Sequence, residues 1–76
     1  MRTERVTMPV YGLGYGGSGV WAVESAMHQV AGVTRVYVNA DTEMAYLEYD
    51  PRGFNFDQLL SAVERVGYRL GAVRLH

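Results

Sequence analysis

Stretches with the two-residue alternation of a strand and stretches with helical spacing follow one another along a chain of only 76 residues. The predicted order is strand 5–11, helix 20–31, strand 33–40, strand 44–49, helix 56–66 and strand 68–75. Two strand–helix–strand units in so short a chain predict an α+β, ferredoxin-like βαββαβ sandwich. We expect one domain over residues 1–76, with a four-stranded antiparallel sheet in the order 4-1-3-2 and both helices on one face.

Cap and turn residues mark where these elements begin and end. Ser18 is the predicted N-cap of the first helix, Gly32 is its predicted stop, and Asn55 is the predicted N-cap of the second helix. Pro9 cannot donate a hydrogen bond to a neighbouring strand, so it favours a sheet edge or a bulge. The second helix is predicted to bury a face made of Phe56, Leu59, Leu60, Val63 and Val66.

The totals of charged and sulfur-bearing residues exclude several functions. Seven arginines stand against eight acidic residues, for a net charge of −1, so nucleic-acid binding is not indicated. The chain has no cysteine, which excludes thiolate metal sites and thiol catalysis. No nucleophile, base and orienting group can be assembled, and we expect no enzyme activity. No apolar run reaches the roughly 20 residues of a membrane span, and we expect a cytoplasmic protein.

Five of the nine glycines fall within residues 12–19, between the first predicted strand and the first predicted helix. Gly12, Gly14 and Gly17 match the G-x-G-x-x-G spacing of dinucleotide-binding folds. Those folds need a continuing parallel sheet, whereas strand 33–40 is predicted to turn back in a hairpin, so nucleotide binding is disfavoured. A weaker hypothesis stays open, in which backbone N–H groups bind a small carboxylate or phosphate at Gly14, Gly16, Gly17, Ser18 and Gly19.

Most of the chain after this segment carries the pattern of a known family. Residues 20–27 read V-W-A-V-E-S-A-M, and Gly32-Val33 follow a few residues later. This resembles the V-x-x-V-E-x-A-L and G-V pattern of the heavy-metal-associated (HMA) domain of copper chaperones, mercury carriers and metal-pumping ATPases. The resemblance continues through residues 36–39, 45–51 and 59–68. It implies the βαββαβ fold and a role in metal transport.

The same resemblance locates the family's metal site in the glycine-rich segment. Members carry G-M-T-C-x-x-C before the first helix, and the two thiolates bind a soft ion such as Cu(I). In this register the two cysteine positions are Gly16 and Gly19, and the methionine and threonine positions are Gly14 and Tyr15. Both thiolates are missing, so no cofactor is expected. The resemblance also predicts that Tyr68 packs against Gly14–Gly19.

Metal binding without cysteine is an alternative that needs other ligands. The candidates are the two histidines and three of the thioethers, with His28 the candidate ligand among them: His28, His76, Met8, Met27 and Met44. Met8 and Met27 fall on predicted core stripes, where packing is the expected role. The five share no recognisable ligand spacing.

The sheet face that the helices leave open offers a different site. Tyr11, Tyr37, Met44 and Tyr46 are predicted to point outward from three strands, with Tyr11 and Tyr46 on neighbouring strands and Tyr37 beside them. Tyrosine is enriched at protein interfaces, and an aromatic patch on an open face favours a protein contact. Trp21, in the first helical turn, either shields the glycine-rich segment or is exposed for a partner.

These observations predict a non-enzymatic HMA-like domain that works by self-association, for example as a homodimer, or by docking a partner protein. A metal carrier or sensor with non-cysteine ligands is the first alternative. A small-anion site at residues 12–19 is the second.

Overall fold

The computed structural model describes residues 2–13 and 17–75, and for residues 17, 18 and 75 it describes the backbone only. Its elements are β1 (Glu4–Tyr11), α1 (Gly17–His28), β2 (Val33–Asn39), β3 (Met44–Tyr49), α2 (Phe56–Arg65), β4 (Arg69–Leu70) and β5 (Arg74–Leu75). Neither helix in this part of the chain is long and apolar enough to cross a membrane.

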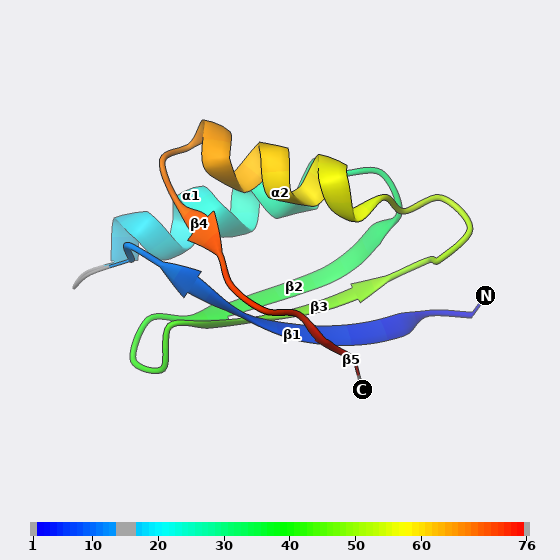
Figure 1. Cartoon of the computed structure of the whole chain (residues 1–76), viewed down its shortest axis with the longest axis horizontal. Helices are drawn as coiled ribbons and strands as arrows, with labels where there is room; N and C mark the ends of the chain where they lie inside the picture. Colours follow the sequence, from blue (N-terminus) through cyan, green and yellow to red (C-terminus); the bar gives the residue numbers. More distant parts are fainter. Residues whose placement is uncertain (1, 14–16, 76) are drawn as a thin grey trace.

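The strands form an antiparallel sheet in the order β2-β3-β1-β4, and β5 also pairs with β1. Both helices lie on the same side of this sheet, and the opposite side carries no helix (Figure 1). The α+β, ferredoxin-like sandwich and the predicted strand order 4-1-3-2 are therefore confirmed. We call the side without helices the outer sheet face.

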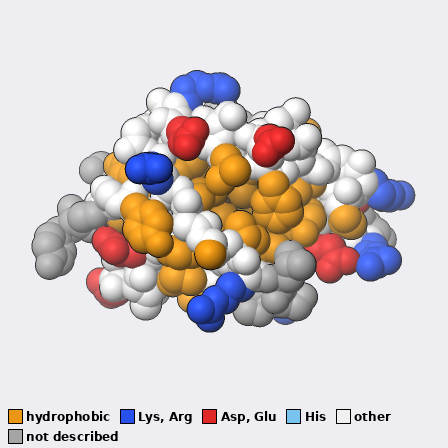
Figure 2. Space-filling view, in the orientation of Figure 1, with side chains coloured by type: hydrophobic (Ala, Val, Ile, Leu, Met, Phe, Trp, Pro, Cys, Tyr) orange, Lys and Arg blue, Asp and Glu red, His pale blue; other side chains and the backbone are white. Residues whose placement is uncertain are grey.

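The core fills the space between the sheet and the two helices. The inward side chains of β1 are fully buried: Val6, Met8 and Val10. They meet Val23 and Met27 of α1 and the matching inward residues of the other elements: Val38, Ala45, Leu47, Leu59 and Val63. On the side where β4 and β5 run, Figure 2 shows hydrophobic side chains gathered between α2 and the strands. The alternation of side chains along β1 therefore places every second residue from Val6 to Val10 in the core.

The first helix differs from its prediction at both ends. Ser18 lies inside α1, so its assignment as the N-cap was wrong. The helix ends at His28 and not at residue 31, because the next amides bond only three residues back. Val30 N–H donates to the Met27 carbonyl at 3.1 Å, and Val33 N–H donates to the Val30 carbonyl at 3.2 Å. This tighter winding ends the helix before the chain enters β2.

The last strand was predicted over 68–75 and is instead two short strands separated by residues 71–73. Pro9 of β1 faces this gap, since its carbonyl accepts the Gly71 N–H at 2.8 Å. In an antiparallel pair the N–H and C=O of one residue point to the same neighbour, so the donor that proline lacks would also have faced the gap. A proline is tolerated in this central strand because the pairing on that side is already interrupted.

The second helix has the predicted cap but a narrower buried face. Asn55 accepts the Asp57 N–H at 2.7 Å through its side-chain oxygen, as an N-cap does. Leu59 and Val63 are buried, whereas Leu60 and Val66 are exposed and do not belong to the core as predicted. A helix that packs against a sheet on one side buries only a stripe, and these two residues lie outside it.

A glycine closes the second helix. Gly67 has φ +95°, its N–H donates to Glu64, and the Tyr68 N–H donates to the Val63 carbonyl. This is a Schellman motif, which needs a left-handed residue after the C-cap. The motif sets the direction in which the chain leaves α2 and so places Tyr68.

We expect Gly67→Ala to destabilise the protein by about 1–2 kcal/mol, because a Cβ is strained at this φ. Gly53→Ala is the matched control, since both positions have open space for a Cβ but Gly53 has no positive φ. The control should be neutral or stabilising by about 0.4–1 kcal/mol. Urea unfolding of both variants measures the difference, and equal effects would contradict the assigned strain.

Candidate functional site

One end of the molecule holds the segment in which the HMA pattern has its metal ligands. Gly14, Tyr15 and Gly16 lie outside the described residues. Gly17, Ser18 and Gly19 are the first three described residues of α1, and of these only Gly19 is described beyond its backbone. The structure therefore shows the surroundings of the second cysteine position but not those of the first.

Tyr68 occupies the space beside Gly19. A Cβ built at Gly19 would lie 3.0 Å from the Tyr68 hydroxyl oxygen and 3.1 Å from the Leu13 carbonyl oxygen. At Gly12 a Cβ would lie 3.6 Å from the Tyr68 ring. Leu13 is itself buried in the core. The position where the family carries a thiolate is thus packed against a tyrosine hydroxyl and a backbone carbonyl, with no room for a side chain unless one of them moves.

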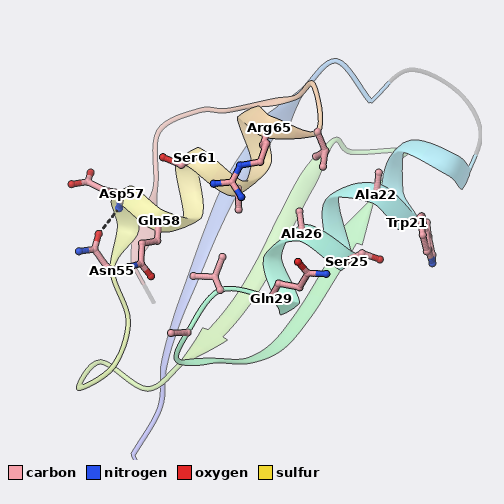
Figure 3. Close-up of a pocket in the computed structure, with 14 residues that line it drawn as sticks. Trp21, Ala22, Ser25, Ala26, Gln29, Asn55, Asp57, Gln58, Ser61 and Arg65 are labelled. Atoms are coloured by element: carbon pink, nitrogen blue, oxygen red, sulfur yellow. Dashed lines mark hydrogen bonds between the residues drawn. The ribbon is translucent and has the colours of Figure 1, made fainter.

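Trp21 stands near this end and is 71% exposed, so it does not shield the segment by burial. It lines an open groove of about 790 Å³ between α1 and α2. In Figure 3 Arg65 and Ser61 line the groove from α2, while Ser25 and Gln29 line it from α1. Small and polar residues make up most of the lining, with Trp21, Val30 and Val66 as its larger apolar side chains.

The outer sheet face is organised in cross-strand rows. Tyr37 of β2, Tyr46 of β3 and Thr7 of β1 lie directly opposite one another. The rings of Tyr37 and Tyr46 stack with centroids 5.9 Å apart at 26°, and they are 55% and 41% exposed. Tyrosines that keep this much surface in water are surface residues and not part of the core.

The other two residues predicted for this face lie in different rows. Met44 is half-buried and lies opposite Asn39 and Pro9. Tyr11 is exposed and lies against the last part of the chain, where a Cβ at Gly71 would approach its hydroxyl to 2.7 Å. Tyr11 and Tyr46 lie on neighbouring strands, but Thr7 and not Tyr11 is opposite Tyr46, and the ring that stacks on Tyr46 is that of Tyr37.

A charged row borders the tyrosine stack. Glu48 lies opposite Arg5 on one side and Arg35 on the other. Its carboxylate is 2.9 Å from Arg5 Nε and 3.9 Å from Arg35 Nε. Together with the stack these residues surround a shallow hollow of about 480 Å³, and the buried Thr7 also lines it. The predicted alternation and strand order put Arg5, Arg35 and Glu48 on one face, and the register puts them in one row.

The described residues contain no group of three or more His, Asp or Glu side chains that could hold a metal. His28 is exposed at the end of α1, and Met8 and Met27 are fully buried packing residues. His76 lies outside the described residues. Of the described candidates, Met8 and Met27 share the buried core, whereas His28 is exposed outside it.

Two acidic residues that the sequence did not indicate as important, Glu24 and Asp50, make hydrogen bonds within the fold. Glu24, the glutamate of the HMA pattern, accepts the Val38 N–H at 2.9 Å and so covers an amide on the free edge of β2. Hydrogen bonds from Arg52 hold the pKa of Asp50 below its ordinary value in the turn after β3. The stability linked to this pair is present above the ordinary aspartate pKa and is lost as the pH falls through the lowered value.

Comparison with known proteins places this geometry in a family. No protein-family model and no curated protein matches the chain. Among solved structures it is similar to the CopZ metallochaperone, with 30% identity, a TM-score of 0.79, and coverage of 88% of this chain and 98% of that one. It is also similar to oxidised MerP from Ralstonia metallidurans CH34, with 27% identity, a TM-score of 0.83, and coverage of 92% and 96%.

A third similar structure is the N-terminal domain of a potential copper-translocating P-type ATPase from Bacillus subtilis in its Cu(I)-loaded state. The identity is 26%, the TM-score 0.82, and the coverage 91% of this chain and 85% of that one. The chain belongs to the heavy-metal-associated domain family. Its relatives are metallochaperone and metal-binding domains and not enzymes. The chain itself has no cysteine.

We expect Gly19→Ala to cost about 1–2 kcal/mol in the parent chain, because the added Cβ meets the Tyr68 hydroxyl. In a Tyr68→Phe background the cost should fall by about 1 kcal/mol, since the nearest atom is gone. Urea unfolding of the parent chain, the two single variants and the double variant measures this coupling. The change from glycine to alanine gains the same helix propensity in both backgrounds, so that gain cancels in the comparison. Gly53→Ala in both backgrounds should be additive. An equal cost of Gly19→Ala in both backgrounds would rule out the contact.

Proposed function

We propose that this HMA-family chain works by docking to another protein surface, either a second copy or a partner, through its outer sheet face. It does not carry a metal on thiolates. The observation that carries the proposal is the exposed Tyr37–Tyr46 stack over β2 and β3, on a face that no helix covers. The cytoplasmic location, the single-domain organisation and the role of residues 14–19 remain expectations from the sequence.

The missing thiolates support a role other than soft-metal transfer. One similar structure is described as loaded with Cu(I), an ion that prefers thiolate and thioether ligands. This chain has no cysteine anywhere, and its second cysteine position is closed by Tyr68 and Leu13. A carrier must both hold and release its ion, and this chain has no thiolate for either step.

The tyrosine stack supports docking on physical grounds. Two aromatic side chains fixed against each other lose little conformational entropy when a partner covers them, and tyrosine is enriched among the residues that dominate binding. The neighbouring hollow, with Arg5, Arg35 and Glu48 at its border, supplies the polar rim that such contacts carry.

Two competing functions follow from the same fold. The family relationship favours a metal held by non-cysteine ligands, with His28 as candidate. The absence of acidic residues from the described first turn of α1 favours a small anion at residues 12–19, since a helix N-terminus attracts negative charge. Titration of the purified chain with Zn²⁺, Ni²⁺ and inorganic phosphate, followed by amide NMR, tests both.

For the metal, we expect no stoichiometric Cu(I) binding by the parent chain in competition with a chromophoric Cu(I) chelator under reducing conditions. A variant with Gly16→Cys, Gly19→Cys and Tyr68→Phe should take up one Cu(I), because it regains both thiolates and the space for the second. Binding by the parent as tight as by the variant would overturn the proposed loss of metal carriage.

For docking, we expect Tyr37→Ser combined with Tyr46→Ser to lose the proteins that the immobilised parent chain retains from an extract of its source cells. Trp21→Ser is the matched control, because it removes an exposed aromatic from the helix side. Quantitative mass spectrometry compares the retained proteins, and light scattering of each variant reports a second copy. Identical retention and identical mass for all three chains would contradict docking through the outer sheet face.

A further inference from the structure

Charge is divided unevenly between the outer sheet face and the rest of the chain. Four of the seven arginines lie on this face, and only one of the eight acidic residues does. The register shows this directly, because each arginine is opposite a residue of the face: Arg5 and Arg35 with Glu48, Arg74 with Thr7, and Arg69 with Tyr11. The chain is slightly acidic overall, yet this face is strongly basic.

These four arginines lie on the same face as the tyrosine stack, and we call them the arginine frame: Arg5, Arg35, Arg69 and Arg74. Arg74 is opposite Thr7, in the row that continues the stack, and Arg69 is opposite Tyr11, farther along β1. Arg5 and Arg35 flank Glu48 in the row next to the stack, and both remain largely exposed. Each contacts Glu48 through Nε, and a guanidinium has five N–H donors in a planar fork. The remaining donors can bind further carboxylates in the bidentate geometry that guanidinium favours.

We propose that the outer sheet face binds an acidic segment of another protein and repels a second copy of itself. The proposal rests on the docking function proposed above and names the partner's chemistry. Carboxylates of the segment pair with the arginine frame, while an apolar or aromatic side chain covers the Tyr37–Tyr46 stack. Two copies placed face to face would bring both arginine frames together, and like charges in one interface cost several kcal/mol.

Glu48 also argues against a nucleic-acid ligand. Its carboxylate lies at the centre of the row, between Arg5 and Arg35, and is partly exposed. A phosphate chain carries charge continuously and would have to pass this carboxylate. A peptide can place its carboxylates on the arginines and an uncharged residue over Glu48.

The test is fluorescence anisotropy of the full chain with three labelled probes of equal length. The probes are a peptide of alternating glutamate and tyrosine, a peptide of alternating lysine and tyrosine, and oligouridylate. We expect the glutamate peptide to bind at least tenfold more tightly than the lysine peptide. Binding should weaken between ionic strengths of about 0.01 M and 0.15 M, where the screening length falls from about 30 Å to 8 Å.

Variants assign the binding to the arginine frame. Arg5→Glu with Arg35→Glu should weaken binding of the glutamate peptide at least tenfold, and Arg5→Gln with Arg35→Gln should give an intermediate loss in case charge reversal perturbs the fold. Arg52→Glu is the control, because Arg52 pairs with Asp50 in a turn away from this face. Amide NMR should map the peptide to β1, β2 and β3.

Failure of this inference and failure of the docking function give different results. No glutamate-peptide binding, equal binding of both peptides, tighter oligouridylate binding, or a dimer of the parent chain at low salt overturns the acidic partner. In the retention experiment with a cell extract, the tyrosine variants can lose the proteins that the parent chain retains while the arginine variants still retain them. This result would support docking through the outer sheet face and would show that the partner is not recognised by its acidic residues. If both sets of variants keep them, both proposals are wrong.

Discussion

The pairing of β1 with β3 is the interaction on which the rest of the structure depends. Their register runs from Glu4 opposite Tyr49 to Pro9 opposite Met44, in the middle of the sheet. Because strand side chains alternate, this register sends Val6 and Met8 into the core and leaves the rows with Arg5 and Thr7 outside. A slip by one residue would exchange the two sets and bury arginine. One constraint therefore builds both the core and the surface that we propose as functional.

The end of the molecule beyond β1 shows how the same fold exists without the family's thiolates. The Schellman turn at Gly67 delivers Tyr68 to the side of Gly19, and the buried Leu13 completes the packing. Glycine at the second cysteine position is thus explained locally, as the residue that fits under a tyrosine hydroxyl. The fold of the family is compatible with glycine here because Tyr68 and Leu13 pack against this position.

Sequence patterns predicted the elements, their order in the sheet and most of the core, since alternation and helical spacing report directly which side of an element is buried. The predictions from these patterns failed where the structure of an element is determined by contacts with residues distant in the sequence. The gap in the last strand faces Pro9, some sixty residues earlier, and the narrow buried face of α2 depends on how the helix lies on the sheet. The predicted tyrosines were correctly placed on the outer face, but the Tyr37–Tyr46 stack needed the register, which puts Thr7 rather than Tyr11 opposite Tyr46.

The central claim is that this HMA-family chain acts through its outer sheet face and not through the former metal end. The most direct measurement is site-specific photo-crosslinking in the source cells, with a photoreactive amino acid at position 46 or, in a separate chain, at position 21. Tyr46 lies in the outer face, and Trp21 is exposed beside the metal end. The account predicts a covalent adduct with an acidic protein from position 46, lost when Arg5 and Arg35 are reversed in charge. Adducts from position 21 with none from position 46 would contradict it.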